Sequence, residues 1–312
     1  MNIFYCFDKN YNTQAYLSIQ SIKDNTKEKL NIFILHNDPK SFSKLLKQLE
    51  DSDTNISINK FDNINNIKFP NIENSHISEA TYYRLFIGEY LDKKIDEILY
   101  VDADTVCLND FTEIYYENLN NLKESKFIIG ARTVGEKTSK NHDLWERLDM
   151  DGKYFNAGVM FIDMKKWRIE NTQNKLLDKL ESLRDKIVYW DQDVLNSFFD
   201  GQYMEINKNL NFDTSGDFVD EDINKIYEDV YFVHYMGSNK PWGILSSLDK
   251  KSILYQNLSI KYFNRYHLVS NYRRKDLINF LKILLSLKFL KANNIILFLI
   301  SCVKFIFFKK TI

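Results

Sequence analysis

Apolar runs alternate with amphipathic stretches over the first part of the chain. Three runs have the length and character of buried or half-buried strands: NIFYCFD (2–8), NIFILH (31–36) and TNISINKF (54–61). Ala15, Ile19 and Ile22 follow the first run at helical spacing, and Phe42 and Leu45 follow the second in the same way. Strands that alternate with helices favour an α/β domain with a largely parallel sheet.

The same pattern continues toward the C-terminus. Further strands are predicted at 96–106, 126–131, 154–163 and 229–236. Helices are predicted at 78–91, 164–184, 191–199 and 246–264. Because no low-complexity linker precedes about residue 265, we expect one large domain over 1–265 and a separate C-terminal segment over 266–312.

The composition excludes several classes of function. The 312 residues are 44% hydrophobic and carry a net charge of -1, which excludes disorder and removes the basic footprint of a nucleic-acid binder. The 3 cysteines show no paired spacing, which favours a reducing compartment. The N-terminus reaches Asp8 without a basic segment or a long apolar run, so we expect no secretory signal and a cytoplasmic protein.

Four polar residues lie at predicted strand ends. Asp8, Asp102 and Asp104 follow apolar strands, and His234 lies inside or just after another. Ligands of open α/β sheets bind at the carboxyl ends of strands. We therefore expect these side chains to converge on one crevice.

The chain has five D-x-D triplets, of which only Asp102/Asp104 and Asp191/Asp193 follow apolar runs. The others are typical of solvated loops. Two carboxylates on a turn after a strand can hold a divalent cation, which neutralises the charge of a departing diphosphate. An imidazole from His234 would shift the preference toward manganese, although a histidine in an apolar strand is also typical of a packed core.

The segment HYMGSNKPW (234–242) adds two phosphate-binding features. Gly237 permits close approach of the backbone to a phosphate, and Lys240 supplies a positive charge. An ordinary turn after a strand is the alternative interpretation.

Six segments occur in an order that resembles glycosyltransferase family 8. They are DKNY (8–11), TYYRLFIGEYL (81–91), YVDADTV (100–106), FNAGVMFID (155–163), WDQDVLN (190–196) and HYMGSNKPW (234–242). The resemblance extends from residue 2 to about 265. It implies a retaining, metal-dependent enzyme of the GT-A nucleotide-diphospho-sugar transferase fold, an α/β fold with a Rossmann-like, mixed, mostly parallel sheet. Bacterial members transfer galactose or glucose to surface glycans of lipopolysaccharide or capsule type.

The resemblance also implies a donor site for a UDP-hexose. Asp8, Asn10 and Tyr11 would hold uracil and ribose, Arg84 would reach the donor from its helix, and Ala103 would contact it in the metal-binding turn.

Metal and phosphate roles follow from the same resemblance. Asp102, Asp104 and His234 would bind Mn²⁺. Gly237 and Lys240 would hold the diphosphate, with Lys240 also stabilising the departing UDP.

The sugar pocket is implied to consist of Asn156, Asp191 and Gln192, near the anomeric carbon. Family members often carry an aspartate after the strand that matches 126–131, but the sequence here continues through 132–136 without one. Galactose and glucose therefore both stay open. Because Gln192 is a poor nucleophile, the family pattern favours front-face transfer over double displacement.

Two other interpretations compete with a transferase. Asp102 and Asp104 also fit the D-x-D-x-[TV] pattern of haloacid dehalogenase-like phosphatases, as nucleophile and general acid. A non-catalytic carbohydrate-binding membrane protein is the second, because 15% of the residues are aromatic.

The C-terminal segment carries an excess of positive charge that the rest of the chain lacks. Residues 273–312 hold nine Lys/Arg and one acidic residue, Asp276, and predict one or two helices. The run 295–308 is too short for a spanning helix, which needs about 20 apolar residues. We expect a peripheral anchor on the anionic inner leaflet of the cell membrane, where the enzyme would meet a glycan or glycolipid acceptor. A helix packed on the catalytic domain, or an oligomer interface, is the alternative.

Overall fold

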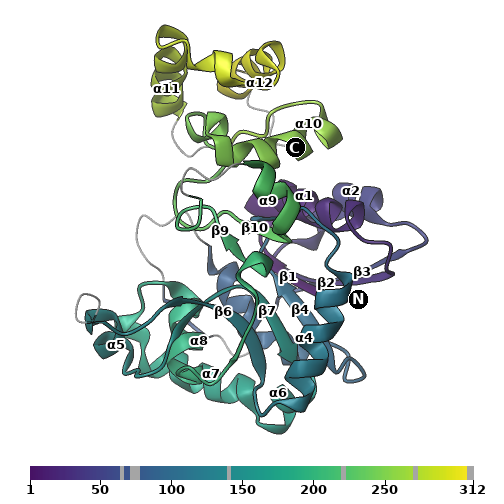
Figure 1. Cartoon of the computed structure of the whole chain (residues 1–312), viewed down its shortest axis with the longest axis vertical. Helices are drawn as coiled ribbons and strands as arrows, with labels where there is room; N and C mark the ends of the chain where they lie inside the picture. The colour runs from purple at the N-terminus through teal and green to yellow at the C-terminus, as the bar shows by residue number, and fades with distance from the viewer. Residues whose placement is uncertain (64–66, 71–77, 139–141, 219–222, 270–272, 308–312) are drawn as a thin grey trace.

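The computed structural model describes residues 1–63, 67–70, 78–138, 142–218, 223–269 and 273–307. Helices flank a central sheet, and the two C-terminal helices lie beyond α10 at one end of the molecule (Figure 1).

Seven strands of the described chain form the central sheet, in the order β3-β2-β1-β4-β7-β6-β8. Their bounds are β1 Asn2–Phe7, β2 Leu30–His36, β3 Thr54–Lys60, β4 Glu97–Val101, β6 Ile129–Gly135, β7 Tyr154–Asp163 and β8 Met204–Glu205. Neighbours are parallel from β3 to β4 and again between β6 and β8, whereas β7 is antiparallel to both β4 and β6. The predicted mixed, mostly parallel sheet is confirmed.

A smaller sheet lies beside the carboxyl end of β4. It consists of β5 Thr105–Cys107, β10 Phe232–His234 and β9 Phe212–Asp213, in that order. His234 pairs with Thr105 on one side and Asp213 on the other. The Asp102–Asp104 turn between β4 and β5 is therefore fixed beside His234.

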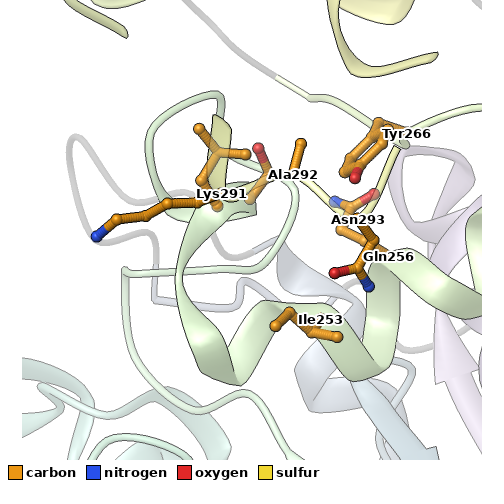
Figure 2. A pocket seen from close by; sticks show the side chains of 8 residues that line it. Ile253, Gln256, Tyr266, Lys291, Ala292 and Asn293 are labelled. Carbon is orange, nitrogen blue, oxygen red and sulfur yellow. The ribbon is translucent and has the colours of Figure 1, made fainter. Parts of the chain in front are cut away.

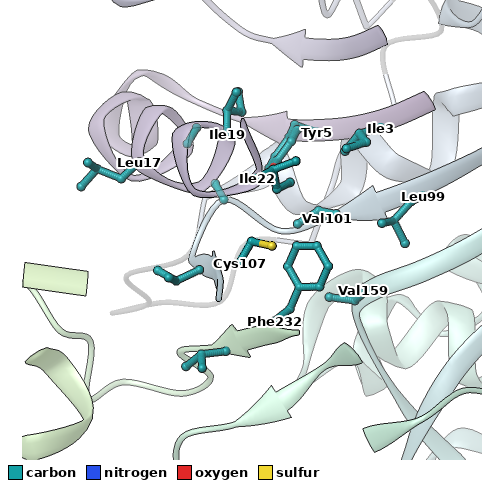
Figure 3. Packing of buried hydrophobic residues seen from close by; sticks show 14 of the residues in the cluster. Ile3, Tyr5, Leu17, Ile19, Ile22, Leu99, Val101, Cys107, Val159 and Phe232 are labelled. Carbon is teal, nitrogen blue, oxygen red and sulfur yellow. The ribbon is translucent and has the colours of Figure 1, made fainter. Parts of the chain in front are cut away.

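Alternation along the strands gives the large sheet two apolar faces. Ile3, Tyr5 and Phe7 of β1 belong to one cluster, and Phe4 and Cys6 belong to the other. The first cluster also contains residues of α1 Asn12–Asp24, α2 Pro39–Leu49, α4 Thr112–Glu124, α9 Ile223–Asp229 and α10 Ile253–Phe263. The second also contains residues of the 3-10 helix Glu79–Phe86 and of α3 Ile87–Tyr90, α6 Met164–Ile169, α7 Thr172–Ser182 and α8 Trp190–Phe199. Figure 3 shows side chains of β1, α1, β4 and β10 meeting in the first layer.

Several predicted bounds are wrong for identifiable reasons. The segment 78–91 is mostly a 3-10 helix, Glu79–Phe86, because it is buried almost all round and packing sets its backbone. The helix predicted at 164–184 breaks at Asn171, whose φ is 52°. The helix predicted at 246–264 becomes α-helical only at Ile253, after two short 3-10 turns. Pattern reasoning also missed α4, α9 and α5 His142–Leu148, as well as the two-residue strands β8 and β9.

The C-terminal segment forms two helices, α11 Arg273–Leu285 and α12 Ile295–Phe307. Phe280, Phe298 and Cys302 pack together and against Tyr266 and Leu268. A small pocket lies where Lys291–Asn293 meets α10, lined in part by Ile253, Gln256 and Tyr266 (Figure 2). Among the described residues, every helix falls short of the length and apolar character needed to cross a membrane.

Candidate active site

Two carboxylates and one imidazole meet at the carboxyl end of β4. Ligand atoms of Asp102, Asp104 and His234 all lie within 4.8 Å of one another. His234 Nε2 is 3.2 Å from Asp104 Oδ1 and 3.8 Å from Asp102 Oδ2. Carboxylate oxygens with one imidazole nitrogen suit Mn²⁺ or a similar divalent ion. The three residues predicted as metal ligands are thus brought together, and their donor atoms fit the ion.

Gly158 of β7 makes room for the imidazole. A Cβ added at Gly158 would lie 2.0 Å from His234 Cε1, so any side chain here would displace the ring. The Gly158 carbonyl also accepts a hydrogen bond from Asp102 N at 2.7 Å. One glycine therefore sets the positions of two candidate ligands.

The turn after β10 brings Lys240 to the carboxylates. Its Nζ donates to Asp104 Oδ2 at 2.5 Å and to the Tyr235 carbonyl at 2.7 Å. Burial alone would raise the pKa of Asp104, but the Lys240 ammonium and His234 outweigh it and hold that pKa well below its usual range. Gly237 is exposed at φ 73°, a conformation that favours glycine.

Arg84 is a buried residue that joins two acidic groups. Its Nη2 is 2.8 Å from Asp102 Oδ1, its Nε is 2.8 Å from Asp191 Oδ2, and its Nη1 donates to the Ala157 carbonyl. Burial raises the pKa of Asp191 to about 7 despite the nearby guanidinium, and Asp102 adds to the rise. Tyr100 donates a second hydrogen bond to Asp102 Oδ1 at 2.7 Å. These contacts hold the Asp102 carboxylate in place. A contact of Arg84 with the sugar donor stays a prediction.

Asn156 and Gln192, both predicted to line the sugar pocket, are hydrogen-bonded to each other. Asn156 Nδ2 donates to Gln192 Oε1 at 3.0 Å, and Ala157 N donates to the same oxygen at 3.1 Å. Gln192 Nε2 in turn donates to the Tyr154 hydroxyl at 3.2 Å. The two amides are therefore held rigidly beside the candidate metal ligands.

The residues predicted to hold uracil and ribose lie at the end of β1, which pairs with β4. Asp8 Oδ1 accepts a hydrogen bond from Asn10 N at 2.8 Å and starts a short 3-10 turn, Lys9–Tyr11. Tyr11 packs edge-on against Trp242, with ring centroids 5.8 Å apart. Burial raises the pKa of Tyr11, and the carboxylates of Asp104 and Asp8 add to it. Tyr11 therefore lies near Asp104, one of the candidate metal ligands.

Sequence reasoning missed three residues that shape this site. Gly158 lies inside the FNAGVMFID segment, so its position was visible but its steric role was not. Tyr100 reads as an ordinary core aromatic in an apolar strand. Asn211, whose Oδ1 is 2.9 Å from His234 Nδ1, lies in a segment with no recognisable pattern.

Comparison with known proteins shows which family the sequence belongs to and which solved structures share its fold. The model of glycosyl transferase family 8 covers residues 2–246. Lipopolysaccharide 1,2-glucosyltransferase of Escherichia coli is 31% identical over 257 residues, covering 77% of this chain and 73% of the relative. Lipopolysaccharide 1,3-galactosyltransferase of Salmonella typhimurium is 30% identical over 251 residues, covering 77% and 72%. The crystal structure of the galactosyltransferase LgtC with donor and acceptor sugar analogs has a TM-score of 0.68 at 24% identity, covering 88% of this chain and 99% of that one.

The chain belongs to glycosyl transferase family 8, and its fold is GT-A. It is a glycosyltransferase. This assignment decides against the haloacid dehalogenase-like phosphatase and against a non-catalytic carbohydrate-binding protein.

Proposed function

We propose that this enzyme transfers galactose or glucose from a UDP-hexose to a glycan or glycolipid of the cell surface, with Mn²⁺ and with retention, forming an α-linkage. The observation that carries the proposal is the Asp102, Asp104 and His234 cluster with Lys240 beside it. The similarity to a glucosyltransferase and a galactosyltransferase of lipopolysaccharide supports a hexose donor and a surface-glycan acceptor.

We assign binding and charge compensation to residues of the chain. Asp102, Asp104 and His234 would hold the divalent cation, which when bound supplies charge neutralisation for the diphosphate. Lys240, next to Asp104, would bind a phosphate oxygen and stabilise the UDP that leaves. Asp8, Asn10 and Tyr11, at the neighbouring strand end, would bind uracil and ribose.

The contacts of the sugar-pocket residues favour front-face transfer. Double displacement requires a free carboxylate nucleophile close to the anomeric carbon. Asp191 is buried and paired with Arg84, and Gln192 Oε1 already accepts two hydrogen bonds. We therefore assign Asp191 and Gln192 to positioning of the sugar, together with Asn156 and Arg84.

For the C-terminal segment we propose peripheral attachment to the inner, cytoplasmic face of the cell membrane. Exposed apolar side chains line α11 and α12, and lysines lie among them: Leu277, Ile278, Leu281, Leu285, Ile296, Ile300, Val303, Lys282 and Lys304. A surface of this composition suits an interface with anionic lipid. It would keep the active site close to a lipid-linked acceptor.

The proposal is tested by UDP release from a panel of UDP-sugars, with Mn²⁺ or with EDTA and without an acceptor. We expect slow hydrolysis of UDP-galactose or UDP-glucose that stops in EDTA. Release that EDTA leaves unchanged would contradict the metal assignment. No release from any UDP-sugar, even after addition of lipopolysaccharide-core acceptors, would contradict the donor class.

A further inference from the structure

Asn211 is a buried amide behind the candidate metal ligands, and all of its polar groups are engaged. Its backbone N donates to the Lys208 carbonyl at 3.1 Å, and its carbonyl accepts from Arg132 Nη1 at 2.7 Å. Arg132 is itself held by Asp217, with Nη2 2.8 Å from Oδ1. The backbone of Asn211 is thus clamped, and its side chain reaches both His234 and Asn156.

Two backbone N–H groups determine how the amide of Asn156 is oriented. Gly158 N donates to Asn156 Oδ1 at 2.9 Å, and Ala157 N donates to Gln192 Oε1 at 3.1 Å. A backbone N–H is only a donor, so both side-chain atoms must be oxygens. Asn156 Nδ2 then donates to Gln192 Oε1, and neither amide can be reversed without placing two donors face to face.

The same argument extends from Asn156 to His234. Because the atom of Asn156 that faces Asn211 is the acceptor Oδ1, the atom of Asn211 opposite it must be the donor Nδ2, at 2.9 Å. Asn211 Oδ1 is then the atom 2.9 Å from His234 Nδ1. An amide oxygen only accepts, so Nδ1 carries the hydrogen, and Nε2 is the ring nitrogen left to face the two carboxylates.

We infer that Asn211 is a positioning residue that keeps the hydrogen of His234 on Nδ1 and so reserves Nε2, which faces Asp102 and Asp104, for the metal. The tautomer follows from contacts within the chain, whereas its use in metal binding rests on the proposed function. Through Asn156, the same amide links the metal ligand to Gln192 in the predicted sugar pocket. Partners of this kind typically change metal affinity about 10- to 100-fold when they are removed.

His36 provides an internal reference with the opposite tautomer. Asp38 N donates to His36 Nδ1 at 2.7 Å, so that nitrogen has no hydrogen. His36 Nε2 therefore carries it and donates to Asn12 Oδ1 at 2.9 Å. One spectrum of the wild-type protein should contain both tautomers.

The first test is ¹⁵N NMR of the histidine rings in the metal-free, full-length chain, at about pH 8.5, above the ~6.5 typical of free histidine. Protonated and unprotonated ring nitrogens are resolved by their shifts, and a His36→Gln variant assigns the reference signals. We expect protonated Nδ1 in His234 and protonated Nε2 in His36. A His234 Nδ1 that carries no hydrogen would overturn the inference, whether or not the enzyme is active.

Two substitutions then separate positioning from packing. Asn211→Asp keeps an acceptor for Nδ1–H but loses the donor to Asn156, whereas Asn211→Leu removes both. We expect Asp to retain the His234 tautomer, and Leu to lose it and to weaken Mn²⁺ binding about 10- to 100-fold, measured by electron paramagnetic resonance. Asn118→Leu removes a buried amide that, among the described residues, donates to the Ile114 carbonyl of its own helix, and it should leave both readouts unchanged.

The outcomes distinguish this inference from the proposed function. Equal losses of Mn²⁺ affinity in Asn211→Asp and Asn211→Leu, with no change of tautomer in either, would reduce Asn211 to a packing residue. A wild-type protein that has the expected tautomer but does not bind Mn²⁺ would contradict the proposed metal and leave the tautomer assignment intact.

Discussion

The active-site region buries charged side chains, whereas the C-terminal helices expose apolar ones. Around the site, Arg84, Asp104 and Asp191 are charged residues that lie below the surface. In the tail, Leu285 and Ile296 are apolar residues with 86% and 72% of their surface exposed. Buried charges are tolerated when they are paired, and here the partners belong to the same chain. Exposed apolar side chains have no comparable partner within the described part of the tail, and the membrane attachment proposed above would cover them.

The largest expected effect comes from breaking the buried charge network at a metal ligand. Asp102→Asn keeps an oxygen for Tyr100 and Arg84 but removes a negative charge from the cation site. We expect Mn²⁺-dependent UDP release to fall by about 1,000-fold or more, which corresponds to about 4 kcal/mol. Circular dichroism should remain that of the wild type.

Another D-x-D triplet supplies the control. The Asp151 side chain is 91% exposed, and Asp151→Asn should leave turnover within about 2-fold of wild type, in line with the small effects of surface substitutions. Near-normal activity of Asp102→Asn would mean that this carboxylate does not hold the metal.

A steric change at Gly158 should have the next largest effect. In Gly158→Ala the new methyl group would overlap the His234 ring, which must move away from the two carboxylates. We expect Mn²⁺ affinity to fall about 100-fold, a loss of about 2.7 kcal/mol, measured by titration with electron paramagnetic resonance.

Gly88 is a matched position because a Cβ there meets the flexible Gln173 amide at 3.2 Å. Gly88→Ala should therefore retain the affinity of the wild type. Equal losses in both variants would show that general destabilisation, not displacement of His234, causes the effect.

The same contrast explains what the sequence can predict. Asp102, Asp104 and Lys240 follow apolar runs or glycine turns, so the local pattern marks them as candidates, and the resemblance of six ordered segments to family 8 implies their roles. The contacts of Asn211 and Gly158 form only when β7 comes close to β9 and β10, which lie far from it in the chain. The pattern of residues 78–91 predicts a regular helix, but the bulky side chains buried on nearly every side impose a 3-10 backbone. Local patterns therefore identify the ligands, and tertiary packing determines the groups that orient them.

The membrane role proposed for α11 and α12 is tested by placing negative charge among their exposed apolar side chains. The double variant Leu285→Glu with Ile296→Glu should weaken binding to vesicles with anionic lipid about 30-fold, or about 2 kcal/mol, by losing apolar burial and adding repulsion. Ile169 is 70% exposed but lies outside the tail, so Ile169→Glu is the matched control and should bind as the wild type does. Flotation of protein with vesicles measures both. Unchanged flotation of the double variant would contradict a membrane role for this face.

The smallest predicted effect concerns the junction between the catalytic domain and the tail, near residue 265. His267 follows the predicted boundary at 265, yet it is buried, its N donates to Gln256 Oε1 at 3.1 Å, and its Nδ1 is 2.6 Å from the Tyr255 hydroxyl. Burial lowers the pKa of His267 to about 3, and Arg265 adds to the shift. This stabilisation is present above the ordinary histidine pKa of 6.5 and is lost as the pH falls, because only the unfolded chain takes up the proton.

We therefore expect the free energy of unfolding to fall between about pH 6 and pH 5 by about 1 kcal/mol more in the wild type than in His267→Gln, measured by urea titration. Tyr255→Phe removes the hydroxyl contact but leaves the ring buried, so it should retain the wild-type pH dependence. Equal pH dependence in wild type and His267→Gln would mean that residues near 267 unfold separately from the core. The expected difference would instead extend the cooperative unit past residue 265, with the tail beginning as a separate region only at α11.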